Sequence, residues 1–171
     1  KFSRLHLQAE SDVFKPVAVY IKDASSDVNI ARQDNSITSL DIVTKTNNPN
    51  MRTNAVWLDP KKDASCDIKL GLTNVNINMI GGYGNGIAIT RSDGTNNCTN
   101  TNKITVSGNL NIKGTDANGN EDWGIGANKL NALGKENSSG IFVDVNNCEV
   151  WVNGKANMDV YGNGVTVDAS S

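Results

Sequence analysis

The sequence is poor in the residues that build metal sites, membrane spans and nucleic-acid surfaces. Of its 171 residues, three are cysteine, three are proline and one is histidine, His6. A single histidine and the lack of a Cys-x-x-Cys pair argue against a zinc site. No apolar run approaches the roughly 20 residues of a transmembrane helix, so we expect no membrane insertion of this segment. The formal net charge of −2 lacks the positive excess that non-specific nucleic-acid binding requires.

Clustered catalytic groups are scarce as well. The chain has four arginines, and no expected strand carries a concentrated pair of carboxylates. Acid–base cleavage of a polysaccharide needs such a pair, or Ca²⁺ with a basic residue. Stacking of distant segments could still bring together carboxylates such as Asp144 and Asp159. We therefore predict a protein that is not an enzyme and holds no cofactor, with a polysaccharide lyase or glycoside hydrolase as the alternative.

Asparagine, in contrast, is abundant, with 26 residues. Its side chain tolerates left-handed backbone and bonds to nearby peptide groups, which suits tight turns. In stacked repeats, asparagines at equivalent positions also form ladders of side-chain hydrogen bonds. A disordered polar chain is disfavoured because the apolar residues alternate regularly with polar ones.

A short motif occurs twice and reveals an internal repeat. Tyr83-Gly84-Asn85-Gly86-Ile87-Ala88-Ile89 returns as Tyr161-Gly162-Asn163-Gly164-Val165-Thr166-Val167. Gly-Asn-Gly is typical of a sharp turn, and the alternation that follows predicts a strand. A recurring turn and strand indicates a structure built from copies.

Each copy reads as a cysteine followed by three short strands. In the first unit, Cys66 is followed by strands at 68–70, 75–77 and 87–89. In the second unit, Cys98 is followed by strands at 104–106, 110–112 and 140–143, and in the third, Cys148 is followed by strands at 150–152, 158–160 and 165–167. A degenerate copy precedes them at 27–30, 40–42 and 55–58, and alternating segments lie at 5–9 and 17–21. Three strands per unit suit one turn, or rung, of a three-sided β-solenoid. We predict one all-β solenoid domain over residues 1–171, an excerpt of a longer protein.

The three cysteines begin equivalent units, which predicts a stack of small buried thiols. A disulfide between stacked neighbours is the alternative, because adjacent strands bring Cα atoms within bridging distance. An odd number leaves at least one thiol unbridged.

The repeat is interrupted over residues 113–139, between the second and third strands of one unit. A long loop in a compact domain is often functional, so we predict that it projects as a contact surface. An alternative register takes residues 123–127 as the third strand of that unit. The loop carries oxygen ligands at alternate positions, as a Ca²⁺ loop does: Asp116, Asn118, Asn120 and Asp122. The EF-hand pattern fails, however, because its glycine and final glutamate positions hold Glu121 and Ala127.

Two tryptophans are candidate ligand-binding residues. Trp123 lies beside the oxygen-rich loop positions, and Trp151 alternates with Val150 and Val152. If the valines face the core, Trp151 faces outward, where an aromatic ring can stack on sugar or anchor a protein. Packing against an adjacent loop is the alternative for both.

Gly-Asn turns, strands of the Asn-Val-Asn-Ile type and variable loops together resemble a known family. From Val28 to Ala169 the chain is similar to the passenger domains of bacterial autotransporters and filamentous-haemagglutinin-like proteins. That resemblance implies a right-handed parallel β-helix, here of about five rungs. It also implies export to the bacterial cell surface, with an outer-membrane anchor encoded outside this chain.

A member of that family is expected to act in adhesion, aggregation or biofilm formation. Its partners would be host or bacterial surface glycans or proteins, or further copies of itself. A structural stalk that binds nothing is the second alternative to an adhesin.

Overall fold

The computed structural model describes residues 4–30, 39–70, 74–118, 138–160 and 162–168. All regular elements among these residues are β-strands. The described part of the chain contains no helix long and apolar enough to cross a membrane. The strands are β1 (Arg4–Glu10), β2 (Val19–Lys22), β3 (Val28–Asn29), β4 (Ser39–Lys45), β5 (Arg52–Asp59), β6 (Cys66–Leu70), β7 (Asn74–Ile80), β8 (Tyr83–Ile89), β9 (Asn102–Val106), β10 (Asn109–Thr115), β11 (Ser139–Val143), β12 (Cys148–Val152), β13 (Ala156–Asp159) and β14 (Asn163–Val167).

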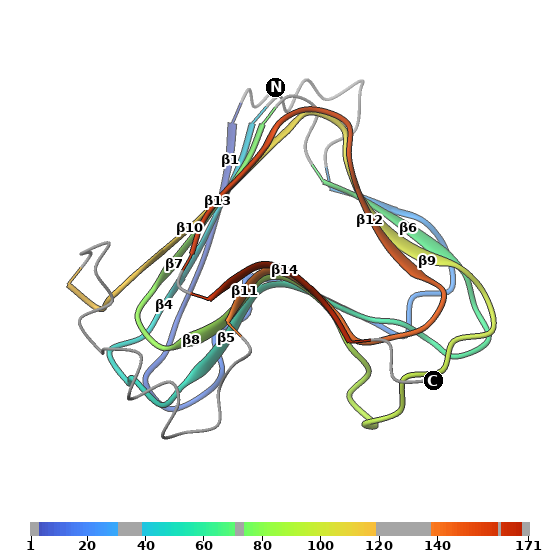
Figure 1. Cartoon of the computed structure of the whole chain (residues 1–171), viewed down its shortest axis with the longest axis horizontal. Helices are drawn as coiled ribbons and strands as arrows, with labels where there is room; N and C mark the ends of the chain where they lie inside the picture. Colours follow the sequence, from blue (N-terminus) through green and yellow to red (C-terminus); the bar gives the residue numbers. More distant parts are fainter. Residues whose placement is uncertain (1–3, 31–38, 71–73, 119–137, 161, 169–171) are drawn as a thin grey trace.

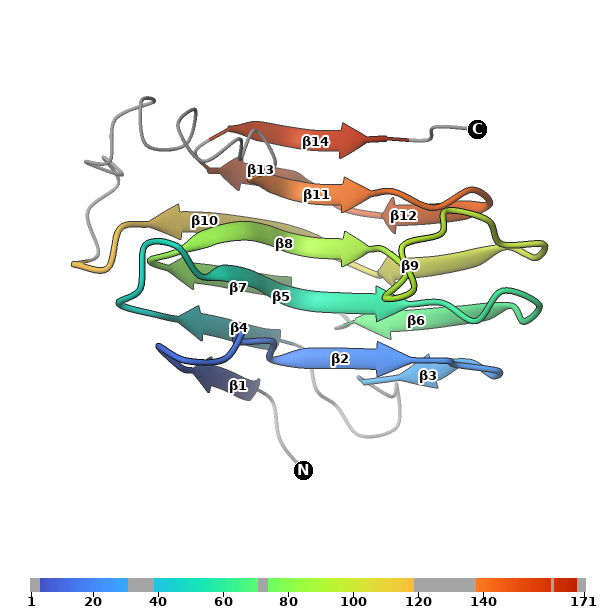
Figure 2. The same cartoon turned by 90° about the horizontal axis from the view of Figure 1, so that it is seen from below.

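The strands form three parallel sheets around one core. Sheet A has the order β1-β4-β7-β10-β13, sheet B the order β14-β11-β8-β5-β2, and sheet C the order β12-β9-β6-β3. Successive strands of the chain lie in successive sheets, and equivalent strands stack on one another (Figures 1 and 2). This all-β architecture of stacked parallel strands is consistent with a β-solenoid.

The strand register confirms the predicted units. Val75 pairs with Leu110 in sheet A, and Ile68 pairs with Ile104 in sheet C. β11 lies between β8 and β14, so the third strand of the interrupted unit is Ser139–Val143. The alternative register, with that strand at 123–127, is wrong.

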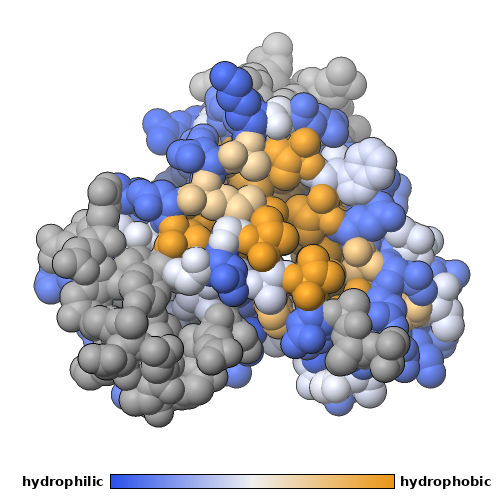
Figure 3. Space-filling model, viewed as in Figure 1, coloured by the Kyte–Doolittle hydropathy of each residue, from blue (hydrophilic) through white to orange (hydrophobic). Residues whose placement is uncertain are grey.

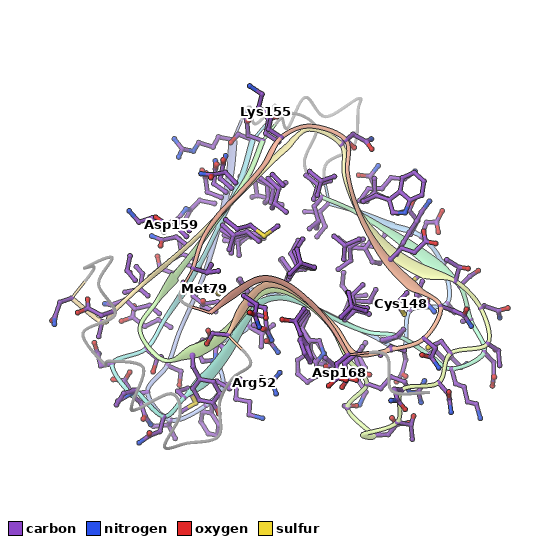
Figure 4. All side chains as sticks on the ribbon, in the orientation of Figure 1. Arg52, Met79, Cys148, Lys155, Asp159 and Asp168 are labelled. Carbon is purple, nitrogen blue, oxygen red and sulfur yellow. The ribbon has the colours of Figure 1, made fainter. Side chains whose placement is uncertain are left out.

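The core consists of columns of aliphatic side chains between the sheets. One column on sheet B contains Val19, Val56, Ile87, Ile141 and Val165, which are aligned by register. Its middle members are buried, and similar columns of side chains extend from the other sheets (Figure 4). Burial of each such side chain contributes about 1.5–3 kcal/mol, so stacking is the main source of stability.

The Gly-Asn-Gly motif lies inside a strand, so its prediction as a turn is wrong. β8 begins at Tyr83, and the turn before it is made by Gly81 and Gly82, with φ of 72° and 65°. A Cβ on Gly86 would lie 2.7 Å from Cγ2 of Ile112 on sheet A. Sheet B bows towards the core (Figure 1), and the glycine permits this close approach.

The interruption of the repeat is shorter than the predicted 113–139. β10 continues to Thr115, which pairs with Ile80, and β11 begins at Ser139. Only residues 116–138 therefore lie between the two strands. The prediction ended the strand at Ile112 because Lys113 is polar. Lys113 faces outward and continues the alternation of β10, so the strand extends beyond it.

The predicted stack of three cysteines is wrong in its middle member. Cys66 and Cys148 both pair with Asn102, so an asparagine stands between them. Cys98 is buried in the connection before β9, where its thiol lies 3.9 Å from the carbonyl oxygen of Lys61. All three thiols are unbridged. The Cys66 thiol instead lies 3.2 Å from Oδ1 of Asn102.

Asparagine ladders, by contrast, occur as predicted. On the outside of sheet A, Nδ2 of Asn111 donates to Oδ1 of Asn76 at 2.9 Å. On sheet B, Nδ2 of Asn85 donates to Oδ1 of Asn54 at 3.1 Å, and Oδ1 of Asn85 accepts from the Ser139 backbone N–H at 3.1 Å. The sheet A ladder is exposed, whereas Asn85 is fully buried.

Replacing Asn85 by alanine is expected to lower the free energy of unfolding by about 2 kcal/mol. The change leaves the buried Ser139 N–H without its acceptor, and an unsatisfied buried group costs about 1–3 kcal/mol. The matched control Asn111→Ala should cost less than about 0.5 kcal/mol, because water replaces the lost bond. Urea denaturation of both variants measures the difference in unfolding free energy. Equal losses in the two variants would contradict the burial of the Asn85 ladder on sheet B.

Candidate functional site

Trp151 is the exposed aromatic side chain of sheet C. It lies on β12 between Val150 and Val152, which pack against the core. The alternation of the strand therefore turns Trp151 outward, as the sequence predicts, and 55% of its surface is exposed. A large ring exposed on a regular strand is held in place by the sheet beneath it and can act as a contact point.

Charged and polar side chains lie beside this ring in a regular array, which we name the Trp151 face. Its residues stand in two rows, set by the register of β6, β9 and β12: Asp67, Lys103 and Glu149 in one row, and Lys69, Thr105 and Trp151 in the other. Neighbouring members of a row lie about 4.8 Å apart, which is the spacing of hydrogen-bonded strands. The face therefore presents its groups at fixed intervals.

Two neighbours orient the indole ring. Its Nε1–H donates to Oε2 of Glu149 at 2.6 Å. The ammonium group of Lys103 lies 5.6 Å from the ring centroid, a cation–π distance. These contacts fix the ring relative to one anionic and one cationic group, while more than half of the side chain stays accessible.

Asp67 links the two rows of the Trp151 face. Its Oδ1 accepts a hydrogen bond from Thr105 at 2.8 Å, and its Oδ2 lies 3.5 Å from Nζ of Lys103. Nζ of Lys69 lies 3.9 Å from the same oxygen. A carboxylate with three partners holds the two lysines of the face in defined positions.

A shallow pocket of about 260 Å³ opens beside the array. Most of the residues that line it have polar or charged side chains: Asp27, Ser65, Cys66, Asp67, Thr101, Lys103 and Glu149. Hydroxyl, carboxylate and ammonium groups beside an exposed ring provide hydrogen bonds and a stacking surface together. Such a combination suits a ligand with many hydroxyl groups and apolar C–H faces, as a sugar has.

The predicted loop site is described only in part. Asp116 and Asn118 form a local turn, in which the Asn118 N–H donates to Oδ1 of Asp116 at 2.8 Å. Asn120, Asp122 and Trp123 lie outside the described residues, so the proposed Ca²⁺ ligands are not seen together. In the part of the chain that the structure does describe, no three histidine, cysteine or acidic residues are grouped for a metal ion.

The carboxylates named for an enzyme are not brought together. Asp159 belongs to sheet A, whereas Asp144 follows β11 in sheet B. Asp144 instead neighbours Asp168, since β11 and β14 pair up to Val143 and Val167. Figure 4 shows Asp159 and Asp168 on different sides of the molecule. Burial, and then the charge of Asp168, raise the pKa of Asp144, while Arg52 opposes the shift.

The thiols beside the Trp151 face are poor nucleophiles. Burial raises the pKa of Cys66 to about 11 and that of Cys148 to about 12, and the nearby Cys98 adds to both shifts. A thiol rather than a thiolate is then present at neutral pH, and the thiolate is the reactive form. These two cysteines therefore act as small packing groups, with Cys66 buried and Cys148 partly buried against the core.

Comparison with known proteins gave no match to a family model, a curated protein or a solved structure. The residues of the Trp151 face are therefore the basis for a functional assignment.

Proposed function

We propose that this chain is a segment of a bacterial cell-surface adhesin that binds carbohydrate through the Trp151 face. The rod that carries the face would be a right-handed parallel β-helix of about five rungs, exported to the cell surface and anchored by a region outside this chain. The observation that carries the proposal is Trp151, which is 55% exposed on a regular strand and held between Glu149 and Lys103.

Aromatic rings recognise sugars by covering the C–H face of the pyranose ring, while nearby polar groups bond to its hydroxyls. An indole offers a large contact area at low entropic cost, which makes tryptophan a frequent anchor. On the Trp151 face, Glu149 and Asp67 accept hydrogen bonds and Lys103 donates them. A sheet surface keeps these groups in register, so little ordering is needed when the ligand binds.

The Trp151→Ala variant is expected to lose carbohydrate binding by about 10-fold or more, equal to about 1.4 kcal/mol. A glycan array of the purified chain, followed by calorimetric titration with the strongest hit, measures the change. Tyr20→Ala is the matched control, because Tyr20 is also exposed, at 46%, but lies on sheet B. Tyr20→Ala should leave the affinity unchanged.

The same screen separates this site from the competing hypotheses. Loss of binding in Trp123→Ala but not in Trp151→Ala would place the contact in the segment 116–138, and dependence on Ca²⁺ would point to Asp116 and its neighbours. Turnover of a bound polysaccharide would favour the enzyme. The absence of any ligand on glycan and cell surfaces would overturn the proposal and favour a stalk.

A further inference from the structure

The pocket beside the Trp151 face is elongated across the strands of sheet C. These strands are hydrogen-bonded neighbours in the order β12-β9-β6-β3. Four strands at the usual spacing span about 14 Å. The lining comes from all four successive turns of the chain: Asp27 before β3, 65–67 at β6, Thr101 and Lys103 at β9, and Glu149 on β12. The pocket therefore runs along the stack rather than along any one strand.

A row of charged side chains follows the pocket from one end to the other. Asp67, Lys103 and Glu149 are aligned by the strand register. The Asp67 N–H donates to Oδ1 of Asp27 at 2.9 Å, which places Asp27 next along this row. Seen along the stack, the sheet C side of the molecule carries mainly hydrophilic side chains, while apolar ones gather in the middle (Figure 3). Each turn of the chain thus offers the pocket a hydrogen-bonding group.

The indole ring stands at one end of this row. Glu149 lines the pocket and also accepts the Nε1–H of Trp151 at 2.6 Å. A single sugar unit is about as large as the aromatic ring on which it stacks, so one unit on Trp151 does not reach Asp27, three strands away. A chain of linked units does reach it, and its hydroxyls recur at intervals, as the polar groups of the pocket do.

We propose that the Trp151 face binds an internal stretch of a linear polysaccharide without acidic groups, which lies along the pocket across β12, β9, β6 and β3. This inference rests on the proposed carbohydrate binding at the Trp151 face and names the kind of carbohydrate. Each further unit adds contacts to a further strand, while the first unit already bears the loss of translational freedom. The affinity should therefore rise with chain length until the pocket is filled.

The charge of the lining excludes acidic polysaccharides. It contains the three carboxylates of Asp27, Asp67 and Glu149 but one ammonium group, that of Lys103, which lies 3.5 Å from Oδ2 of Asp67. Burial raises the pKa of Cys66 in this lining, and the charges of Asp27 and Asp67 add to the shift. Like charges placed together weaken binding, so a chain of uronic acids is repelled. A neutral chain only needs the acceptor oxygens.

Calorimetric titration of the intact chain with oligosaccharides of one to six units tests the proposal. The neutral probes are oligomers of β-1,4-glucan, β-1,3-glucan and β-1,4-linked N-acetylglucosamine, and α-1,4-galacturonan oligomers form the acidic series. At least one neutral series should gain about 10-fold or more in affinity between two and four units. Galacturonan of the same length should bind about 10-fold more weakly than that series, or not at all.

A bulky side chain in the middle of the pocket tests where the chain lies. Ser65 is exposed, so Ser65→Phe fills the pocket without disturbing the core. It should lower the affinity for the six-unit oligomer by about 10-fold, whereas Trp151→Ala should weaken binding of every length. Ser92→Phe is the matched control, because Ser92 is exposed on the connection after β8, and it should change no affinity. Circular dichroism verifies the fold, and Thr101→Phe replaces Ser65→Phe if the latter unfolds.

The outcomes separate this inference from the proposed function. An affinity that is already maximal with one or two units, a strongest response to galacturonan, or array binding to branched or terminal sugars alone would overturn the linear ligand and leave an adhesin that binds carbohydrate. A six-unit oligomer that binds Ser65→Phe and Thr101→Phe as tightly as the wild type would do the same. No binding to any oligomer or to any glycan on the array would overturn both.

Discussion

Replacing Gly84 by alanine is expected to lower the free energy of unfolding by about 3–5 kcal/mol, which removes a large part of the stability of a typical domain. Gly84 has a φ of 142°, where side chains are strained, and its added Cβ would lie 1.8 Å from the backbone oxygen of Thr53. A backbone atom of a central strand cannot move aside as a side chain can. Backbone strain and overpacking each cost about 1–3 kcal/mol.

Gly94 provides the matched control for this substitution. Its φ of 74° is also positive, but a Cβ there would meet nothing within 4 Å. Gly94→Ala should therefore cost only the conformational strain, about 1 kcal/mol. Urea denaturation followed by circular dichroism compares the two variants. Equal losses would show that the close stacking of β8 on β5 does not exist in solution.

The second large effect is expected in the core column of sheet B. Val56→Ala removes two methyl groups from a fully buried side chain, at about 0.8 kcal/mol for each group plus the cost of the cavity. The expected loss of unfolding free energy is about 2.5 kcal/mol. Val165→Ala is the same substitution in the same column at its exposed end, and it should cost less than about 0.5 kcal/mol.

Urea denaturation of both valine variants, measured at one protein concentration, compares the two losses. A loss for Val165→Ala as large as that for Val56→Ala would contradict the exposure of Val165 on β14.

Alternation of apolar and polar residues was enough to place most strands. Val75, Asn76 and Ile77 alternate strictly, as do their equivalents in the next unit, because each strand has one face in the core. The turn expected at Gly84-Asn85-Gly86 was wrong because local preference was overridden by packing. Asn85 is buried between Asn54 and Ser139 in the ladder of sheet B, and the flanking glycines allow the close approach of neighbouring strands.

The candidate site was predictable only in its aromatic member. The exposure of Trp151 follows from Val150 and Val152 on either side. Its partners Asp67 and Lys103 come from other units, and only the strand register brings them to the same face. A signal was nevertheless present in the sequence, since Asp67, Lys103 and Glu149 each stand immediately before an aliphatic core residue of their strand, namely Ile68, Ile104 and Val150.

Carbohydrate binding at the Trp151 face is tested most directly by titrating the ¹⁵N-labelled chain with the best glycan ligand and recording two-dimensional NMR spectra. The chain has three tryptophans, so the indole N–H region holds three signals, which Trp→Phe variants assign. If carbohydrate binds to the Trp151 face, the Trp151 signal shifts on saturation while the Trp57 signal stays in place. Trp57 lies on β5 of sheet B, where its indole N–H donates a hydrogen bond to the Thr90 carbonyl. A bound ligand that leaves the Trp151 signal unmoved would contradict the assignment of the Trp151 face as the binding site.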